Sequence, residues 1–484
     1  MISAKLVSVL KSFSHEETRE FEKFLLSPFF NTNKSYVKFY KGLLKFHPDY
    51  KSELLTSENI YGRMFAGKPY SKQTMWNLSS GLEKLAEEFL TQLSLIKKPL
   101  EKFNLIIDEF RMRLLGRHFN KKLSEWEKMT DIYKIDIDQL YNLALLEENK
   151  VSYWQQIKGI SGKQTDNYFE LAQIYTLYYL ITISRIINSI ITGRTFSGFS
   201  GHSSMAEDFV RNINFDKFIE ISKKNNYKYS DLIEFYYNII YCDLNPENEK
   251  YYFNARKFLF KNHALFSYKE KKDLTSNLAN YCTEKNRLGY SNFYRELFNI
   301  NKFRLEHGVA IYFNGTIGKI LYKQIVINAS SLMEIQWAEK FVEKYTPLLH
   351  EEHRESMKKL AMAYIYFNTK KYGEVLDSLS KFKSADMNDK IAVKNLIARS
   401  YYEMKEFELL LYHIDSAKHF IKSNKKIGNY LREINGNFFN YLHSIVTEAE
   451  QKDEYKVRIL KQNISKDNMV NHKNWLLEKL AELQ

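Results

Sequence analysis

Two Gly-Lys pairs and one pair of histidines come closest, in this sequence, to motifs that carry chemistry. Gly162-Lys163-Gln164 has Gln where a phosphate-binding P-loop needs a Ser or Thr hydroxyl for magnesium, and Gly159 is too close to complete the loop. Gly318-Lys319-Ile320 fails in the same way. His350 and His353 are three residues apart, whereas zinc-binding histidines on one helix are spaced at i and i+4. We therefore expect no catalytic residue, no metal site, no cofactor and no enzymatic activity.

Cysteine usage and hydropathy favour a soluble cytoplasmic protein. Cys242 and Cys282 are 40 residues apart, without the short spacing of a metal site, which is typical of a reducing compartment. Residues 1–10 lack the uninterrupted apolar run and the cleavage site of a signal peptide. The most apolar stretch, residues 171–191, contains Arg185, which would be costly at the centre of a membrane-spanning helix. We expect a buried helix there and no membrane partner.

Residues 56–92 predict a helix, a glycine-containing turn and a second helix, an arrangement that DNA-binding proteins use. Ser71 is a suitable N-cap for the second helix. An apolar stripe from Met75 to Phe89 leaves the other face of this helix polar. The side chains there that could read base edges are Lys72, Gln73, Trp76, Asn77 and Ser80. The alternative is an ordinary helical hairpin that caps a solenoid.

A net charge of +14 and a pI near 9.2 would also suit a nucleic-acid partner. The densest basic stretch, residues 418–432, contains no acidic residue. Its cations are Lys418, Lys422, Lys425, Lys426 and Arg432. The alternative is a compositional bias towards Lys, Asn, Ile, Tyr and Phe, and cations are favoured behind a helix C-terminus in any case. Net charge bears on solubility and non-specific binding more than on function.

Long helices with short connections are the elements that must position these residues. Only six prolines and 17 glycines interrupt the chain, and 27% of its residues are charged. Ser14 and Glu17 form a capping box at the start of an amphipathic helix. Residues 103–328 have the pattern of successive helices with short loops. We predict an all-α fold, an α-solenoid of antiparallel helix pairs.

One helix-pair pattern occurs twice between Met357 and Phe420. In each copy a small residue lets the two helices approach, and aromatic and apolar residues fill the space between them. Corresponding positions lie 35 residues apart, close to the period of about 34 in tetratricopeptide repeats. Because one pair cannot bury its apolar face alone, such pairs must stack. The positions are Ala363, Tyr366, Tyr372, Val375 and Leu379 in the first copy, and Ala398, Tyr401, Phe407, Leu410 and Ile414 in the second.

Four short motifs accompany these twin repeats: Ser27-Pro-Phe-Phe-Asn31, Gly67-Lys-Pro-Tyr70, Ala279-Asn-Tyr-Cys282 and Gln336-Trp-Ala-Glu-Lys-Phe341. Together they resemble an uncharacterised family of bacterial cytoplasmic proteins with an N-terminal helical region and C-terminal tetratricopeptide-like repeats. The resemblance extends over nearly the whole chain and implies no activity, cofactor or catalytic residue. Lys359 and Lys394 stand where tetratricopeptide repeats often carry Trp, which is a departure from the regular repeat.

The resemblance to tetratricopeptide repeats implies that the first helix of each pair lines a groove for a protein or peptide. It places Met357, Leu360, Tyr364, Phe367 and Asn368 in the groove from the first repeat, and Asn395, Arg399, Tyr402 and Glu403 from the second. Asn368, Asn395 and Arg399 would grip a carboxylate, because Asn donates and Arg can donate two parallel hydrogen bonds. Solvated polar residues on an exposed helix face are the alternative.

We expect three segments: an N-terminal helical domain with the hairpin at 1–98, an irregular helical-pair solenoid at 99–328, and tetratricopeptide-like repeats with C-terminal capping helices at 329–484. The favoured function is a non-enzymatic scaffold that binds a protein or peptide. The alternative is a nucleic-acid-binding regulator, in which the hairpin reads DNA and the repeats serve as an effector or oligomerisation module.

Overall fold

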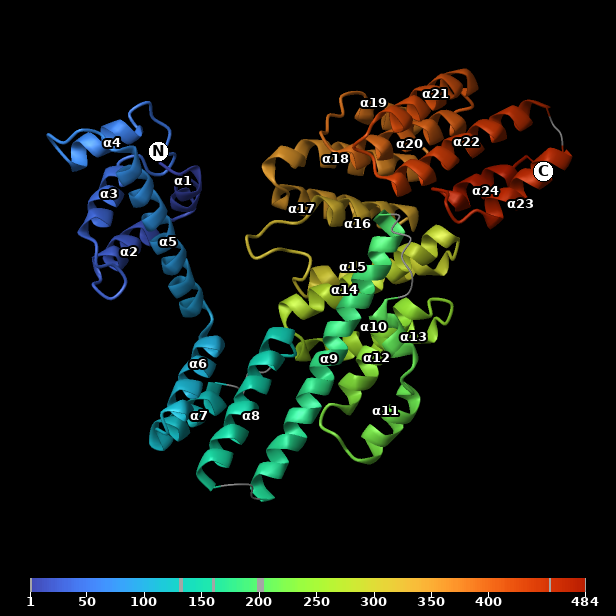
Figure 1. Cartoon of the computed structure of the whole chain (residues 1–484). Helices are drawn as coiled ribbons and strands as arrows, with labels where there is room; N and C mark the ends of the chain where they lie inside the picture. The colour runs from blue at the N-terminus through green and yellow to red at the C-terminus, as the bar shows by residue number, and fades with distance from the viewer. Residues whose placement is uncertain (1, 130–133, 159–161, 198–203, 452–453, 484) are drawn as a thin grey trace. The chain divides into compact units, whose positions relative to one another are not determined.

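The structure is a computed structural model that describes residues 2–129, 134–158, 162–197, 204–451 and 454–483. In those ranges it contains 24 α-helices and no β-strand (Figure 1). The predicted all-α class, a solenoid of helix pairs, is confirmed. The chain divides into two compact units, Met1–Asp131 and Ile132–Gln484.

The first unit is organised around its long fifth helix, α5. Helices α1 to α4 all pack on α5, whose buried stripe of Met75, Leu78 and Leu82 is the one that the sequence predicts. The capping box is present, since Ser14 and Glu17 each accept a hydrogen bond from the other's backbone N–H. The helices are α1 Ala4–Lys11, α2 His15–Leu26, α3 Lys34–Leu44, α4 Ser57–Met64, α5 Lys72–Lys97, α6 Pro99–Met112 and α7 Gly116–Met129.

The second unit is a succession of helix pairs. In the successive pairs, α14 packs on α15, α16 on α17, α18 on α19, α20 on α21 and α22 on α23. Before them, α8 and α12 both pack on α9. The first half comprises α8 Ile137–Lys158, α9 Gly162–Ser197, α10 Met205–Arg211, α11 Phe215–Lys224, α12 Ser230–Leu244, α13 Lys250–Lys261, α14 Tyr268–Leu288 and α15 Asn292–Glu306.

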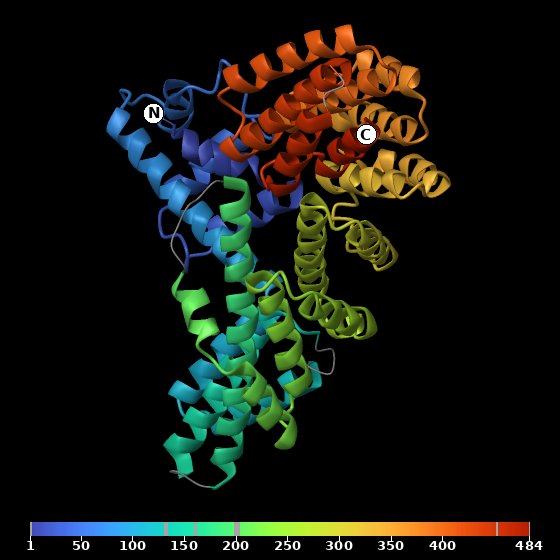
Figure 2. The same ribbon diagram turned by 90° about the vertical axis from the view of Figure 1, so that its right-hand side faces the viewer.

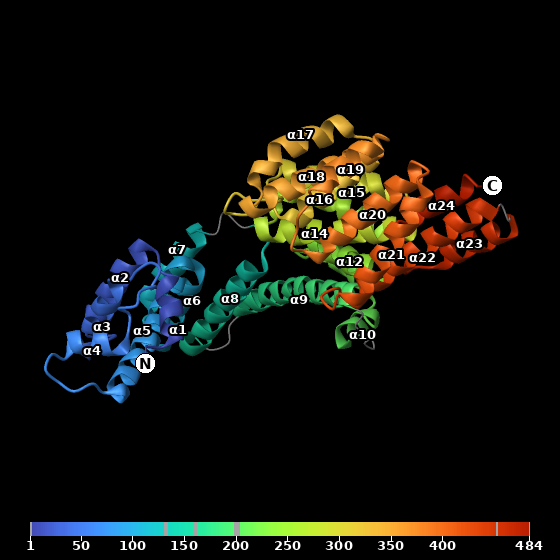
Figure 3. The same cartoon turned by 90° about the horizontal axis from the view of Figure 1, so that it is seen from above.

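The later pairs stack in layers, which Figure 2 shows as the orange and red ribbons. Contacts of α16 with α18 and of α18 with α20 join the first helices of successive pairs, and α24 lies beside α22 and α23 (Figures 1 and 3). The second half comprises α16 Lys319–Ser331, α17 Ile335–Tyr345, α18 Glu351–Asn368, α19 Tyr372–Ser380, α20 Met387–Glu403, α21 Phe407–Ser423, α22 Asn429–Gln451, α23 Glu454–Lys466 and α24 Lys473–Ala481.

The twin pattern coincides with α18–α19 and α20–α21. The small residues Ala363 and Ala398 are fully buried, and so are Val375 and Leu410 in the second helix of each pair. The four aromatic positions are partly buried against the same clusters. The twin pattern therefore marks two similar packing sites, in which the small side chain of alanine lets the helices approach and rings fill the remaining space.

The apolar helix α9 runs through the stretch that the sequence assigns to a buried helix. Its segment Asp166–Arg194 is the one helix in the described ranges with the length and composition to cross a membrane, with a mean hydropathy of 1.3 and 39% of that window buried. The core helices of soluble proteins have the same properties. Ile174, Leu177 and Ile181 are fully buried in the core that α9 shares with α12.

The predicted segment boundaries do not coincide with the division into compact units. The boundary after residue 98 falls between α5 and α6, inside the first unit, and the boundary after residue 328 falls inside α16. The units divide between residues 131 and 132. Composition does not show whether two successive helices pack in the same unit, because both have the pattern of an amphipathic helix.

Candidate functional site

Arg399, near the end of α20, is held between two aromatic rings. Its guanidinium carbon lies 4.2 Å from the ring centre of Phe367 on α18 and 5.2 Å from that of Trp475 on α24. Contacts of this kind attract a cation to the ring and restrict the rotamers of a long side chain. We term Arg399 and these two rings the arginine cradle.

Arg399 has no hydrogen bond and no ion pair with any residue that the structure describes. Its Nε–H is enclosed without an acceptor, and the residue as a whole is half-buried. Burial lowers its pKa, and the nearby Tyr364 and Glu403 act in the opposite direction. Because a guanidinium keeps its proton at physiological pH, the cradle contains a positive charge without a bound counter-charge.

The ionisable groups around the cradle leave this charge in place. Burial raises the pKa of Tyr364 to about 12, so its hydroxyl is neutral at pH 7. Burial, and then the charge of Arg399, keep the pKa of His472 well below its ordinary value, so the imidazole is also neutral. Glu403 accepts from Trp475 Nε1 at 2.8 Å and lies 3.0 Å from Lys479 Nζ, so its charge is matched by that lysine.

Helix α24 supplies the second ring of the cradle, and this residue was not identified from the sequence. Trp475 lies edge-on to Tyr402 at 5.4 Å and is anchored by its hydrogen bond to Glu403. Leu476 and Leu480 are fully buried in the same cluster. Trp475 is far from Arg399 in the sequence, and no motif there singles it out.

The predicted carboxylate grip of three residues is wrong in two of its members. Asn395, which is 2% exposed, donates to Asn435 Oδ1 at 2.7 Å. Asn368 donates to Ser330 Oγ at 3.1 Å and to the Tyr364 carbonyl at 2.9 Å. Both amides therefore join neighbouring helices within the unit, because a buried polar side chain must find a partner. Arg399 is the member that keeps free donors.

The apolar groove candidates are also packed rather than open. Met357, Leu360, Tyr364, Phe367 and Tyr402 are each at most 7% exposed. They belong to the clusters that join successive helix pairs and include the ring of Trp475. The predicted open groove at these positions is wrong, because α24 and the adjoining helix pairs cover them. Glu403 accepts a hydrogen bond from Trp475 and pairs with Lys479, both on α24.

The hairpin candidates are arranged on α5 as the sequence predicts. The core stripe faces α1 to α4, and the polar residues lie on the other face. Trp76 is 58% exposed, and Gln73 donates to Asn77 Oδ1 at 3.0 Å. Lys72, Gln73, Trp76 and Asn77 are exposed and Ser80 is half-buried.

The basic stretch at 418–432 separates into one structural arginine and four lysines. Arg432 donates to four backbone carbonyl oxygens, those of Ile421, Lys422, Asn424 and Ile427, and so caps the C-terminal end of α21. Its placement in a nucleic-acid-binding patch is corrected, since its donors are used. Lys422, Lys425 and Lys426 are exposed, and Lys418 is half-buried.

The side chains that might do metal or thiol chemistry are dispersed. Within the described ranges, no three residues of His, Cys, Asp and Glu form a group that could hold a metal ion. His350 and His353 both face Glu352, at 3.4 and 3.5 Å. Cys242 and Cys282 are buried free thiols whose pKa is raised by burial, which disfavours the reactive thiolate.

Comparisons with known proteins add no relative. No protein-family model, no curated protein and no solved structure matches the chain. The resemblance to a bacterial cytoplasmic family and to tetratricopeptide repeats therefore stays a prediction from the sequence.

Proposed function

We propose that this protein is a non-enzymatic, cytoplasmic scaffold that binds a protein or peptide partner at the arginine cradle. The observation that carries the proposal is the state of Arg399: a half-buried guanidinium beside two rings, with no acceptor among the described residues. A protein–protein contact would supply the missing acceptor.

A carboxylate is the complement that fits this donor. Arg presents parallel N–H groups that match the two oxygens of a carboxylate, and charge-assisted hydrogen bonds are about twice as strong as neutral ones. Phe367 and Trp475 hold the side chain in one place, so little further conformational entropy is lost on binding. An acidic side chain or the C-terminal carboxylate of a partner would accept from the terminal nitrogens of Arg399.

The test is affinity capture from native lysate with the wild type, Arg399→Met and Arg399→Lys, each with and without nuclease. Met keeps the aliphatic packing between the rings but removes the donors, and Lys keeps the charge but not the paired donors. Arg295→Met is the matched control, because this arginine is exposed and pairs with Glu334 at 2.6 Å. We expect nuclease-resistant partners that are lost from Arg399→Met and retained by Arg295→Met. Equal capture by wild type and Arg399→Met would refute the proposal.

A second candidate function rests on the exposed face of α5. Lys72, Gln73, Trp76 and Asn77 together offer a cation, amides and an indole on one surface, the groups that read nucleic acids. In that case the protein is a nucleic-acid-binding regulator with the repeats as effector. Binding of duplex DNA would then fall steeply between about 50 and 200 mM salt, and Lys72→Glu would abolish it. Absence of binding at about 50 mM salt would exclude this function.

A further inference from the structure

Helix α17 has a basic side and an acidic side, and the two sides face different grooves. Lys340 and Lys344 are one turn apart on one side, and Glu339 and Glu343 are one turn apart on the other. All four are exposed, and none has an ion pair within the described ranges. The fold itself therefore leaves both rows of charge available.

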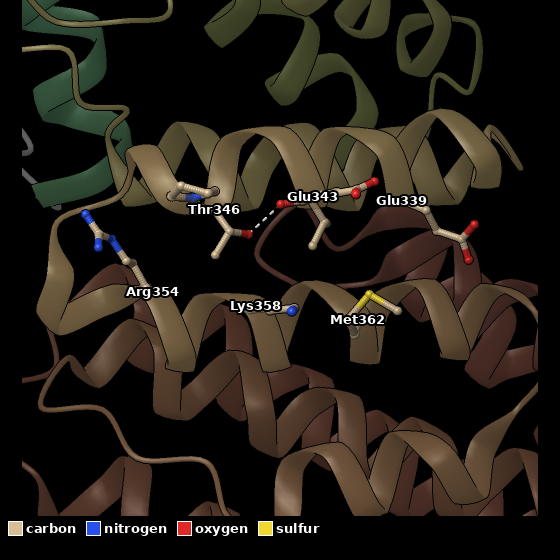
Figure 4. A pocket seen from close by; sticks show the side chains of 8 residues that line it. Glu339, Glu343, Thr346, Arg354, Lys358 and Met362 are labelled. Carbon is tan, nitrogen blue, oxygen red and sulfur yellow. Dashed lines mark hydrogen bonds between the residues drawn. The ribbon is translucent and has the colours of Figure 1, made fainter.

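The groove on the acidic side contains both signs of charge. Glu339 and Glu343 extend from α17, and Arg354 and Lys358 extend from α18 across the gap (Figure 4). Arg354 also donates to the backbone carbonyl of Leu349 at 2.9 Å. Because its two walls oppose each other in charge, this groove selects no single class of partner.

The cleft on the basic side has one dominant sign. It lies between α15 and α17, has a volume of about 300 Å³, and is lined by Lys302 from α15 together with Lys340 and Lys344. Glu306 is the one acidic residue among its lining residues. Lys302 and Lys344 have aromatic contacts but no carboxylate, with Nζ 5.9 Å from the Phe298 ring centre and 5.1 Å from that of Tyr345.

The floor of this cleft is a row of stacked rings. Trp337 stacks on Phe341 at 5.6 Å, and Phe341 stacks on Tyr345 at 4.7 Å. Single-stranded nucleic acids bind by stacking bases on free ring faces, but here the faces of Phe341 are taken by its neighbours. Trp337 and Tyr345 are half-buried, so they present edges and apolar surface instead. This arrangement favours a peptide side chain over a base.

We propose that this lysine cleft docks an acidic segment of a protein partner. An apolar side chain of the segment rests on Trp337 and Leu305, and its carboxylates face Lys302, Lys340 and Lys344. The volume of about 300 Å³ is at the lower end for ligand sites, which span about 300–1,000 Å³, and suits one anchoring side chain. Aromatic anchors inside a polar rim are the usual anatomy of a docking site. The cleft shares no residue with the arginine cradle, so the two proposals fail independently.

The experiment is selection of a randomised peptide library on the full-length protein, followed by fluorescence anisotropy with each selected peptide. The variant is Lys340→Glu with Lys344→Glu. The matched control is Lys358→Glu with Lys381→Glu, which changes the net charge equally at two exposed lysines outside the cleft. Arg399→Met tests independence from the cradle, and circular dichroism with thermal unfolding verifies the fold of each variant.

We expect selected peptides that combine Asp or Glu with a large apolar residue. Their affinity should fall more than about tenfold in the Lys340/Lys344 variant, since like charges would then meet across the cleft, and should be unchanged in the control and in Arg399→Met. Labelling with 5-fluorotryptophan, with the signal assigned by Trp337→Phe, should show the Trp337 resonance shifting on peptide addition. Peptides without acidic enrichment, equal losses in both double variants, or binding of oligouridine in place of any peptide would overturn the proposal.

Discussion

Arg185 and Arg399 are both half-buried in the second unit, and in both the Nε–H is enclosed without an acceptor. They differ at the terminal nitrogens. One terminal nitrogen of Arg185 lies 2.5 Å from Glu270 and 3.3 Å from Asp273, and Tyr236 donates to the other Glu270 oxygen at 2.8 Å. The terminal nitrogens of Arg399 reach no acceptor, and its contacts are two rings. Arg185 connects α9 to α14 by ion pairs, whereas Arg399 makes no hydrogen bond or ion pair with another described helix.

Other arginines of this unit resemble Arg185. Arg194 pairs with Glu207 and Arg256 pairs with Glu296, and Arg432 caps a helix. Arg304 is buried without a carboxylate, but it donates to Asn301 and Ser276. An arginine that serves the fold is thus given an acceptor by the fold, because an unmet buried donor is costly. The exception at Arg399 is the reason to assign it to a partner.

The same substitution at the two arginines should give the largest difference. Arg185→Met leaves the Glu270 carboxylate, which is 1% exposed, without its cation and should lower the free energy of unfolding by about 3 kcal/mol. Arg399→Met leaves no charge unpaired and should change it by less than about 1 kcal/mol. Urea unfolding monitored by circular dichroism measures both. Adding Glu270→Gln to Arg185→Met should restore part of the loss, and comparable losses at the two sites would remove the distinction.

Asp243 is the opposite case, a carboxylate without a cation. It accepts from Asn188 and Asn277, and burial raises its pKa to about 6. The folded state therefore retains a proton that the unfolded state releases near pH 4, so stability falls as pH rises from about 4 to 6. Asp243→Asn should raise the free energy of unfolding by up to about 3 kcal/mol at pH 7.5, and the gain should vanish near pH 4. A gain that does not depend on pH would show that charge burial is not its cause.

Removal of the Arg399 donors should weaken binding of the partner without loss of the fold. A charge-assisted hydrogen bond contributes about 1.5–3 kcal/mol, so Arg399→Met should raise the dissociation constant roughly 10- to 100-fold. Arg399→Lys should have an intermediate effect. Calorimetric titration of the captured partner gives these constants, with Arg295→Met as control. An unchanged constant for Arg399→Met would place the contact elsewhere.

The smallest effect is expected at the second ring of the cradle. Trp475→Phe keeps an aromatic face near Arg399 but removes the hydrogen bond to Glu403, which contributes about 1 kcal/mol. We expect a loss of that size in stability and a several-fold loss in affinity. Hydrogen exchange of α24 should quicken in the variant. If affinity is retained while α24 exchanges faster, the ring does not hold Arg399 for binding.

Local patterns predicted much of the fold. The capping box at Ser14, the stripe beginning at Met75 and the 35-residue spacing from Ala363 to Ala398 all correspond to observed helices and buried positions. These features depend on residues within one or two helical turns, or on one repeated packing site. Periodicity records such contacts directly.

The candidate site could be predicted only in part, because its remaining contacts are long-range. The sequence identified Arg399 but not Trp475, which reaches it through the packing of a terminal helix. Nor could it show that Asn395 pairs with Asn435, or that Arg432 caps α21. The same residue type can have a free or a hydrogen-bonded donor, and the tertiary fold determines which of the two it is.

The most direct test of the central claim is an NMR spectrum of the arginine Nε–H groups during titration with N-acetylglutamate. Variants at Arg399 and Arg185 assign the two signals, and the α-amide of N-acetylglutamine, which has no carboxylate, is the neutral control at matched ionic strength. We expect a saturable shift of the Arg399 signal, no shift of the Arg185 signal, and no response to the amide. An Arg399 signal that stays in place, or that responds equally to the α-amide of N-acetylglutamine, would contradict this assignment.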